Sequence, residues 1–359
     1  MVGIGISTTT GIATVVKNWL ASDFSNKVNL RYLSTQRESV PGAYLAKFVD
    51  GSFALLKIAV LFLGRLLTLK GRWDVMHVHQ SSWMSFWRKQ PIWHFGALCA
   101  RRRVTHLHGS EFQDFYASTS GIRRRLVQRF FERADANLVL SREWKEWVES
   151  ICRRPTRVDI VYNAALRQEV PDRSGRDTVT FALMGRMGKR KGVYDLLEAF
   201  KAIAPSHPQA RLILAGDGEV DEVRALVAGA GLDSQVEVPG WVSGPDAASV
   251  FQRADVYCLP SYNEGLPGSI LEAMAVGLPV ISTPVGGILE AVRHDSTGLI
   301  VEPGDVDAIS KALALLASDS DLRQRMAKAS HALFEEKFDL DAIVEQVMGI
   351  YGELLWPAA

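Results

Sequence analysis

Short apolar segments alternate with longer amphipathic segments along this chain, and the alternation stops once and starts again. Apolar runs of strand length lie first at residues 2–7, 28–33, 75–78, 104–107, 136–140 and 158–161. After the polar stretch RQEVPDRSGRDT they return at residues 179–185, 210–216, 236–240, 256–260, 279–283 and 297–303. Strands that alternate with helices predict parallel α/β sheets, and the restart predicts two of them. We expect two domains, with an active site between them at the carboxyl ends of the strands.

The two parts of the chain differ in charge. Residues 1–170 hold 25 Lys and Arg against 13 Asp and Glu, a net charge of +12; the remaining residues hold 16 against 27, a net charge of −11, and the whole chain has +1. A basic N-terminal part favours an anionic partner, such as a membrane surface, a nucleic acid or a phosphate-bearing substrate. Much of this charge lies in residues 100–106 and 121–135, and the second segment is equally typical of a solvated helix face.

No segment is predicted to cross a membrane. The apolar segment 53–73 is interrupted by Lys57 and Arg65 and falls short of the ~20 apolar residues that a span needs, so a buried helix is favoured over an interfacial one. The N-terminus lacks the basic start of a secretory signal. A reducing compartment suits the three widely separated cysteines, which we interpret as packing residues: Cys99, Cys152 and Cys258.

Two carboxylates in the second half indicate a ligand site. Glu264 follows an apolar run and so lies in a loop at a strand's carboxyl end, and Glu272 lies about one turn inside a helix that is expected to begin at Pro267 and Gly268. A helix start suits phosphate, and carboxylates accept hydrogen bonds from hydroxyls. The pattern favours a nucleotide sugar, although a solvated loop Glu and a helix-face Glu would give the same spacing.

A glycine-rich loop at the start of the second half carries cations. The sequence GRMGKRKG follows the run 179–185 and brings four cations to a strand's carboxyl end, Arg186, Lys189, Arg190 and Lys191. The loop matches neither the P-loop nor the dinucleotide-binding fingerprint. Cations on a glycine loop nevertheless favour a diphosphate, and Arg186 and Lys191 could stabilise a phosphate leaving group.

Several motifs, taken in order, resemble the retaining glycosyltransferases of family 4. In the second half these are Gly185-Arg186 with Lys191-Gly192, LAGDGE (214–219), EGLP (264–267) with Glu272 in E-x7-E spacing, and GLPVISTPVGGILE (277–290). The first half is similar more loosely, through TTTGIATVVKNWL (8–20), DVMHVHQ (74–80), RVTHLHGSEF (103–112) and IVYNAA (160–165).

The resemblance implies the GT-B fold, in which two Rossmann-like, doubly wound parallel-sheet domains face each other across a cleft. An acceptor-binding domain would span residues 1–166, with a C-terminal helix at about 340–359 packing back on it. A nucleotide-sugar-binding domain would span residues 167–339.

The resemblance also implies roles for individual residues. The catalytic set would be Glu264, Arg186, Lys191 and His108. The two cations would neutralise the departing diphosphate, Glu264 would contact hydroxyls of the donor sugar, and His108 would face the transferred sugar. Glu272 would accept hydrogen bonds from the ribose. The rest of the donor site would be Gly265, Leu266, Pro267, Gly268, Gly11, Gly185 and Gly216. The family needs no metal for the chemistry, and no cofactor is expected.

We see no metal constellation in the sequence. Asp305 and Asp307 spell a DxD, but they open a helix, where acidic residues complement the dipole. A histidine near a strand end is more often a satisfied core residue, an interpretation that covers His77, His79 and His106; only His108, which opens HGSEF, is interpreted as functional. Glu111 is interpreted as a helix-capping acid rather than an acceptor-side base.

The sequence thus predicts a retaining glycosyltransferase that moves a hexosyl unit from a UDP- or GDP-sugar to a saccharide acceptor, expected to be lipid-linked, in polysaccharide or glycolipid biosynthesis. Stabilising charge rather than a protein nucleophile would assist departure of the leaving group. Besides donor and acceptor, the expected partner is an anionic membrane surface and not a nucleic acid, which suits a cytoplasmic protein or one peripheral on the inner face of the cell membrane. Two alternatives are an epimerase or phosphorylase on a related fold and a non-catalytic nucleotide-sugar-binding subunit.

Overall fold

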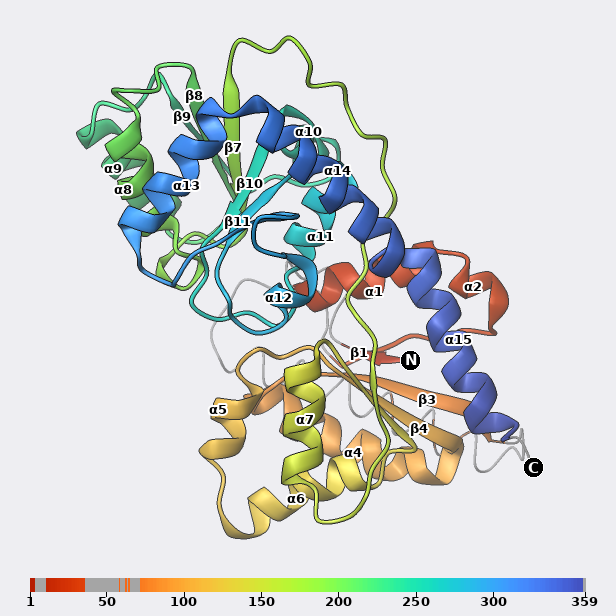
Figure 1. Ribbon diagram of the computed structural model, residues 1–359. Coiled ribbons are helices and arrows are strands. Elements are labelled where there is room, and N and C mark those ends of the chain that lie inside the picture. Colours follow the sequence, from red (N-terminus) through yellow and green to blue (C-terminus); the bar gives the residue numbers. More distant parts are fainter. Residues whose placement is uncertain (4–10, 36–57, 59–61, 63, 65–71, 358–359) are drawn as a thin grey trace. The chain divides into compact units, whose positions relative to one another are not determined.

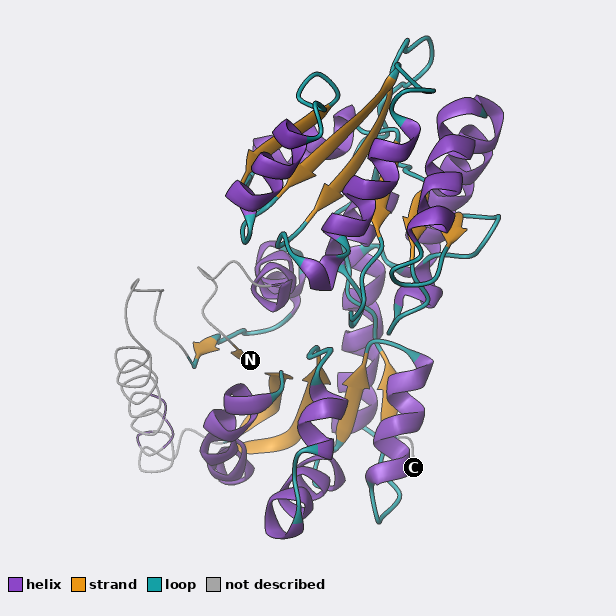
Figure 2. Cartoon of the chain, turned by 90° about the vertical axis from the view of Figure 1, so that its left-hand side faces the viewer, coloured by secondary structure: helices purple, strands orange, loops and turns teal. Residues whose placement is uncertain are grey.

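The computed structural model describes residues 1–3, 11–35, 58, 62, 64 and 72–357 (Figure 1). The chain divides into two compact units, one formed by Met1–Asn163 with Leu340–Ala359 and the other by Ala164–Asp339. The sequence predicts the first boundary three residues later, at 166/167, and the second at about 340. Each unit holds one six-stranded sheet in which every strand pair is parallel, with helices on both faces (Figure 2). The prediction of two parallel α/β sheets is therefore confirmed.

The sheet of the first unit has the strand order β2-β1-β3-β4-β5-β6. Its strands are β1 Val2–Gly3, β2 Leu33–Ser34, β3 Trp73–Gln80, β4 Ala100–Leu107, β5 Ala136–Val139 and β6 Val158–Ile160. The helices of this unit are α1 Gly11–Ala21, α2 Phe24–Lys27, α4 Trp83–Cys99, α5 Phe112–Ala117, α6 Gly121–Glu132, α7 Arg142–Ile151 and α15 Leu340–Leu355.

The first predicted strands differ most from the structure. Of the predicted strand 28–33, only Leu33 is in a strand. The reason is that β2 is an edge strand that pairs with two described residues of β1, and that residues 28–32 are half-buried or exposed. The predicted strand 2–7 lies outside the described residues beyond Gly3. The remaining four predictions coincide with β3, β4, β5 and β6, which are longer or shorter by a few residues.

Alternation along β3 separates the two faces of the first sheet. Met76 and Val78 belong to an aromatic-rich core with α4, α5, α6 and α7, whereas His77 and His79 lie on the other face. The C-terminal helix α15 packs on this unit, where the hydroxyl of Tyr351 lies 2.6 Å from Nδ1 of His77. The end of the chain thus contributes a side chain to the histidine-bearing face.

Most of the apolar segment 53–73 lies outside the described residues. Ile58 and Phe62 are described and buried in the first core, and the ring of Phe62 contacts that of Trp73. Among the helices of the described residues, none combines the length and apolar character needed to cross a bilayer. Cys99 and Cys258 are buried in the two cores, which supports their interpretation as packing residues.

The sheet of the second unit has the strand order β12-β11-β10-β7-β8-β9. Its strands are β7 Val179–Met184, β8 Ala210–Ala215, β9 Val236–Gly240, β10 Val256–Leu259, β11 Val280–Ser282 and β12 Gly298–Ile300, which confirms all six predicted strands. The helices are η1 Lys189–Lys191, α8 Val193–Ile203, α9 Val220–Gly229, α10 Pro245–Arg253, α11 Gly268–Ala275, α12 Ile288–Ala291, α13 Val306–Ser318 and α14 Ser320–Lys337. Strand order reverses at β7, which lies between β8 and β10. Ligands of open parallel sheets bind at the carboxyl ends beside such a reversal.

Candidate active site

The residues predicted for the donor site gather at the carboxyl edge of the second sheet. The loop after β7 carries Gly185, Arg186 and Lys191, the loop after β8 begins with Gly216, and the loop after β10 carries residues 264–268. Because β10, β7 and β8 are neighbours in the sheet, their three loops meet at the strand reversal. The parallel topology alone therefore assembles this set from segments far apart in the sequence.

Lys191 and Glu264 form the most direct contact of this edge. Nζ of Lys191 donates a hydrogen bond of 2.6 Å to Oε1 of Glu264, which also accepts from Oγ of Ser261 at 2.9 Å and lies 3.3 Å from Nη1 of Arg190. Only 9% of Glu264 is exposed. All three contacts reach Oε1, and no hydrogen bond from the described residues reaches Oε2. The contacts of one oxygen thus hold the carboxylate in place, and the other oxygen is not engaged by the described residues.

Two glycines let the loops approach one another. Gly192 has a φ of +68°, and a Cβ there would lie 2.1 Å from the carbonyl oxygen of Pro260. Gly216 has a φ of +146°, and a Cβ there would lie 1.8 Å from the carbonyl oxygen of Gly185. Any larger residue would push the loops apart. Gly192 and Gly216 therefore shape the loops, whether or not they also touch a ligand.

The helix start at α11 is fixed by the loop after β11. Pro267, with φ −67° and ψ 122°, precedes the first helical residue, Gly268. The amide of Gly287 donates to the carbonyl oxygen of Gly265 at 2.5 Å, and Leu266 is buried at 3% exposure. These contacts hold the EGLP segment rigidly, so that the first N–H groups of α11 form a preorganised anion site.

Glu272 lies one turn inside α11 and makes no hydrogen bond or ion pair with the described residues. Burial raises its pKa to about 7. Burial also raises the pKa of Tyr257, to which the charges of Glu272 and Glu264 contribute. A half-buried carboxyl group that lacks a side-chain partner is suited to receive hydroxyl donors from a ligand.

Arg186 is an exposed cation of this edge. Its side chain is 72% exposed, and its ion pair with Asp217 is long, at 3.9 Å. An exposed pair of this length contributes little to stability. The guanidinium can therefore turn towards an anionic ligand at small cost.

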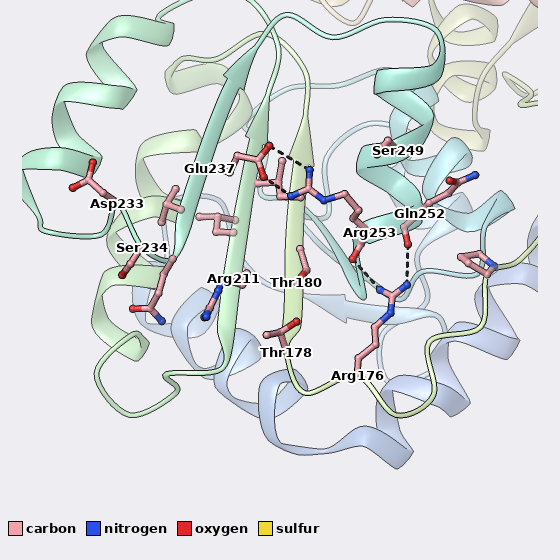
Figure 3. Close-up of a pocket in the computed structure, with 15 residues that line it drawn as sticks. Arg176, Thr178, Thr180, Arg211, Asp233, Ser234, Glu237, Ser249, Gln252 and Arg253 are labelled. Atoms are coloured by element: carbon pink, nitrogen blue, oxygen red, sulfur yellow. Dashed lines mark hydrogen bonds and ion pairs between the residues drawn. The ribbon is translucent and has the colours of Figure 1, made fainter.

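A cavity of about 800 Å³ lies at the opposite edge of the second sheet (Figure 3). Thr178, Thr180 and Arg211 line it at the amino ends of β7 and β8, and the side chains of Arg253 and Glu237 pair within it. The guanidinium of Arg176 donates to the carbonyl oxygens of Arg253 and Gln252. These cations are already engaged, so the cavity does not match the predicted donor site.

The first unit brings four histidine rings together on one face of its sheet. His77 and His79 are two residues apart on β3, and His79 lies opposite His106 in the register with β4, which His108 follows. Ring centroids of neighbouring pairs are 4.1–5.5 Å apart, from His106–His108 to His77–His106. Burial lowers the pKa of all four rings, that of His106 to about 4, so they are neutral at pH 7.

His108 uses both ring nitrogens within the protein. Its Nε2 lies 2.9 Å from Nδ1 of His79, and its Nδ1 lies 3.1 Å from Oδ1 of Asn163. The predicted contact of His108 with a sugar stays a prediction, and a ring nitrogen would have to exchange a protein partner to make it. Gly11, the other residue predicted for this unit, begins α1; residues 8–10 lie outside the described residues.

The interpretation of the other histidines as satisfied core residues is correct about their burial and wrong about their hydrogen bonding. His77, His79 and His106 are buried, but each has one ring nitrogen that lacks a hydrogen-bond partner among the described residues: Nε2 of His77, Nε2 of His79 and Nδ1 of His106. The signal in the sequence is the pair of His-x-His patterns, which places two rings on the same face of each strand. These patterns indicate a histidine cluster only if β3 and β4 are neighbouring strands in the observed register. The sequence does not give that register.

Two interpretations of acidic residues have opposite outcomes. Asp305 caps α13, since its side chain accepts from the amide of Ala308, so the rejection of the DxD as a metal motif is supported. Glu111 occupies the N-cap position of α5, but its side chain makes no capping hydrogen bond. It accepts instead from Nε1 of Trp83 at 2.9 Å. The capping interpretation of Glu111 is therefore wrong.

Both halves of the chain match described protein families. "Glycosyl transferases group 1" matches residues 167–332, and "Glycosyltransferase Family 4" matches residues 30–165. An uncharacterized glycosyltransferase of Methanocaldococcus jannaschii is 26% identical over 301 residues, which cover 78% of this chain and 75% of that protein. The lipopolysaccharide core biosynthesis glycosyltransferase LpsE of Rhizobium meliloti is 32% identical over 198 residues, which cover 54% of this chain and 56% of that protein. This chain thus spans about half of the length of the second relative.

Solved structures share the architecture. The structure of Alr3699/HepE of Anabaena in complex with UDP matches with a TM-score of 0.73 at 17% identity, over 98% of each chain. At this identity the likeness concerns the fold.

Glu272 makes stability depend on pH in a predictable direction. Its pKa is about 7 in the folded protein and about 4.5 unfolded, so the folded state binds the proton more tightly and loses stability as pH rises from about 4.5 to 7. Glu272→Gln removes the buried charge. We expect it to raise the thermal midpoint relative to wild type at pH 8 and to leave it nearly unchanged at pH 5, measured by differential scanning fluorimetry. An equal change at both pH values would contradict the assignment.

Gly192 offers a test of the loop architecture with a matched control. Gly231 has the same φ of +68°, but a Cβ there meets nothing within 4 Å. Gly231→Ala should lower the free energy of unfolding by about 1–2 kcal/mol, the strain of an alanine in the left-handed conformation. Gly192→Ala should cost about 1–3 kcal/mol more, as overpacking does, because its Cβ meets Pro260. Thermal unfolding of the two variants gives the comparison, and equal losses would rule out the close contact.

Proposed function

Because the chain belongs to glycosyltransferase family 4 and carries the two Rossmann-like units of the GT-B fold, we propose that it transfers a hexosyl unit from a nucleotide-diphospho-sugar to a saccharide acceptor with retention of configuration. The observation that carries the proposal is the convergence of Lys191, Glu264 and the start of α11 at the strand reversal of the second sheet. This edge offers cations and N–H groups for a diphosphate and carboxylates for sugar hydroxyls.

A UDP-sugar is the proposed donor. The structures of Alr3699/HepE contain UDP and, in another crystal, UDP-glucose, and the pneumococcal O-GlcNAc transferase GtfA was solved with UDP and GlcNAc. In this chain the amides at the start of α11 and the side chains of Arg186 and Lys191 would bind the diphosphate. Glu272 would accept hydrogen bonds from the ribose hydroxyls, and Oε2 of Glu264 would accept from the sugar.

The proposed chemistry relies on charge stabilisation. When the glycosidic bond breaks, negative charge grows on the β-phosphate, and Arg186 and Lys191 would neutralise it. Lys191 is already oriented by Glu264, so it needs no reorganisation to act. The acceptor hydroxyl would then attack the sugar on the face that the diphosphate leaves, which retains the anomeric configuration.

The acceptor is proposed to be lipid-linked and approached from an anionic membrane surface. Along α4, large apolar side chains face outward at helical spacing, Met84, Phe95 and Leu98, the second with 56% exposure. Next to α4 in the same unit, α6 exposes Ile122 at 82%, with Arg123 and Arg124 beside it (Figure 1). Apolar side chains flanked by arginines suit an interface with anionic lipids. The lipopolysaccharide relative LpsE accords with a lipid-linked product.

Catalysis provides the first test. Lys191→Ala should lower kcat about 10²- to 10³-fold, the usual effect of removing one donor to a developing anion, whereas Lys201→Ala on the exposed side of α8 should leave it unchanged. Transfer of labelled sugar from UDP- and GDP-sugars to an acceptor measures the rate, and NMR of the product reports the anomeric configuration. Turnover of the donor without an acceptor would indicate an epimerase, and donor binding without any turnover would indicate a binding subunit.

Membrane association provides the second test. Flotation with vesicles that contain about 30% anionic lipid should recover the wild-type protein at low salt, and neutral vesicles should recover much less. Arg123→Glu together with Arg124→Glu should abolish recovery while leaving transfer to a soluble acceptor intact. Equal flotation of the variant and the wild type would exclude α6 from the contact.

A further inference from the structure

The histidine-bearing face of the first sheet contains a buried group of ring nitrogens that the proposed glycosyl transfer does not use. One ring nitrogen from each of His77, His79 and His106 lies within 4.8 Å of the other two. All three residues are buried, with at most 2% exposure. They come from β3 and β4, the strands with the longest run of paired residues in this sheet, and therefore stand on a rigid base.

Hydrogen bonds fix which nitrogen of each ring carries the proton. Nε2 of His106 lies 3.2 Å from the carbonyl oxygen of Val161, which only accepts, so Nε2 is protonated and Nδ1 carries the lone pair. Nδ1 of His108 likewise donates to Oδ1 of Asn163, so its Nε2 accepts from Nδ1 of His79. His79 is thereby left with a lone pair on Nε2.

The nitrogens that carry these lone pairs are the ones without a partner. Nδ1 of His106 and Nε2 of His79 are buried and lack a hydrogen-bond partner among the described residues, and so does Nε2 of His77. Nδ1 of His77 lies 2.6 Å from the hydroxyl of Tyr351, whose oxygen can accept a hydrogen bond from an Nδ1–H. Buried acceptors without a donor are costly, and a cation bound among the three rings relieves the cost.

Each ring also has the outer partner that a metal-bound histidine needs. Histidine ligands donate their second N–H to a carbonyl, a carboxylate or a similar acceptor, which fixes the tautomer. Here the acceptors are the Tyr351 hydroxyl, the His108 ring and the Val161 carbonyl. Nε1 of Trp19, another buried atom without a partner, belongs to a ring that packs edge-on against all three histidines. Its N–H could donate to a water molecule in a fourth position.

We propose that His77, His79 and His106 bind one transition-metal ion of the class represented by Zn²⁺, with water as the fourth ligand. Three imidazoles and an open position form a recognised zinc environment. Metal–nitrogen bonds of about 2.0–2.1 Å bring tetrahedral ligands to about 3.3 Å from one another, so the rings must turn inward slightly. The rings of His77 and His79 are now almost parallel, at 11°, and at least one of them rotates.

The ion would position His108 rather than take part in the transfer. Binding at Nε2 of His79 holds its Nδ1–H towards Nε2 of His108, and Asn163 holds the far side of that ring. Nζ of Lys89 donates to the backbone carbonyl oxygen of His79 and not to its ring, so this contact leaves the ring nitrogens available. The proposal replaces the expectation, drawn from the sequence, that the chain holds no metal.

Metal content and spectroscopy of the full chain test the proposal. Protein stripped with a chelator and dialysed against Zn²⁺ should retain one ion per chain through gel filtration, and Co²⁺ in its place should give the intense visible absorption of tetrahedral coordination. Zn²⁺ should also raise the thermal midpoint of the stripped protein. His77→Gln should abolish retention, whereas His94→Gln, which removes an exposed histidine of α4, should not.

A conservative variant covers the case in which His77→Gln does not fold. Tyr351→Phe removes only the outer partner of His77 and should weaken Zn²⁺ binding about 10- to 100-fold, in a competition assay with a chromogenic chelator. The proposal is overturned if the wild type retains no Zn²⁺ and Co²⁺ adds no visible absorption, in which case water fills the pocket. It is equally overturned if His77→Gln and Tyr351→Phe both bind as tightly as the wild type.

Discussion

The Lys191 ammonium and the Glu264 carboxylate lie 73 positions apart in the chain and 2.6 Å apart in the structure, because β7 and β10 are neighbours at the strand reversal. A nearly buried ion pair is a weak source of stability, since desolvation offsets much of the attraction. The effect of the pair is to orient the two charged side chains. The pair holds a cation beside the start of α11 and keeps one carboxylate oxygen engaged, so the charges of the site are in place before a ligand arrives.

The loops that carry this pair are held by close backbone contacts as well as by side chains. Gly192 lies against Pro260, Gly216 against Gly185, and Gly286, with a φ of +56°, against the carbonyl of Glu264, each so closely that a Cβ would not fit. Close backbone contact leaves no freedom for the loops to shift independently. Gly216, which the sequence assigns to the donor site, is thus needed first to build the edge at which a phosphate would bind.

Local patterns in the sequence predict the elements well and the contacts between them poorly. The apolar runs locate all six strands of the second sheet, because buried parallel strands are almost uniformly apolar. The predicted strand 28–33 is wrong except at Leu33, since an edge strand with few partners need not be uniformly apolar. The side-chain partner of Glu111 is missed for another reason: Trp83 meets it only through the folding of α4 against α5, with Trp83 itself at a positive φ of 55°. The contact between Trp83 and Glu111 depends on long-range packing, which no local sequence pattern predicts.

The two units differ in the charge of the polar groups that they bring together. The second unit gathers full charges at a partly exposed edge, where solvent and ligand can compensate them. The first unit gathers neutral rings in its interior, where the β6 strand and the residues after it, through the Val161 carbonyl and Asn163, set the tautomers of His106 and His108. Reversing the contact of Asn163 would alter which nitrogen of His79 carries its lone pair, and reversing that of Val161 would do the same for His106. A backbone carbonyl and one amide side chain therefore determine the chemistry of a cluster they flank, which explains how a group of four imidazoles can remain uncharged and still present an ordered set of ligands.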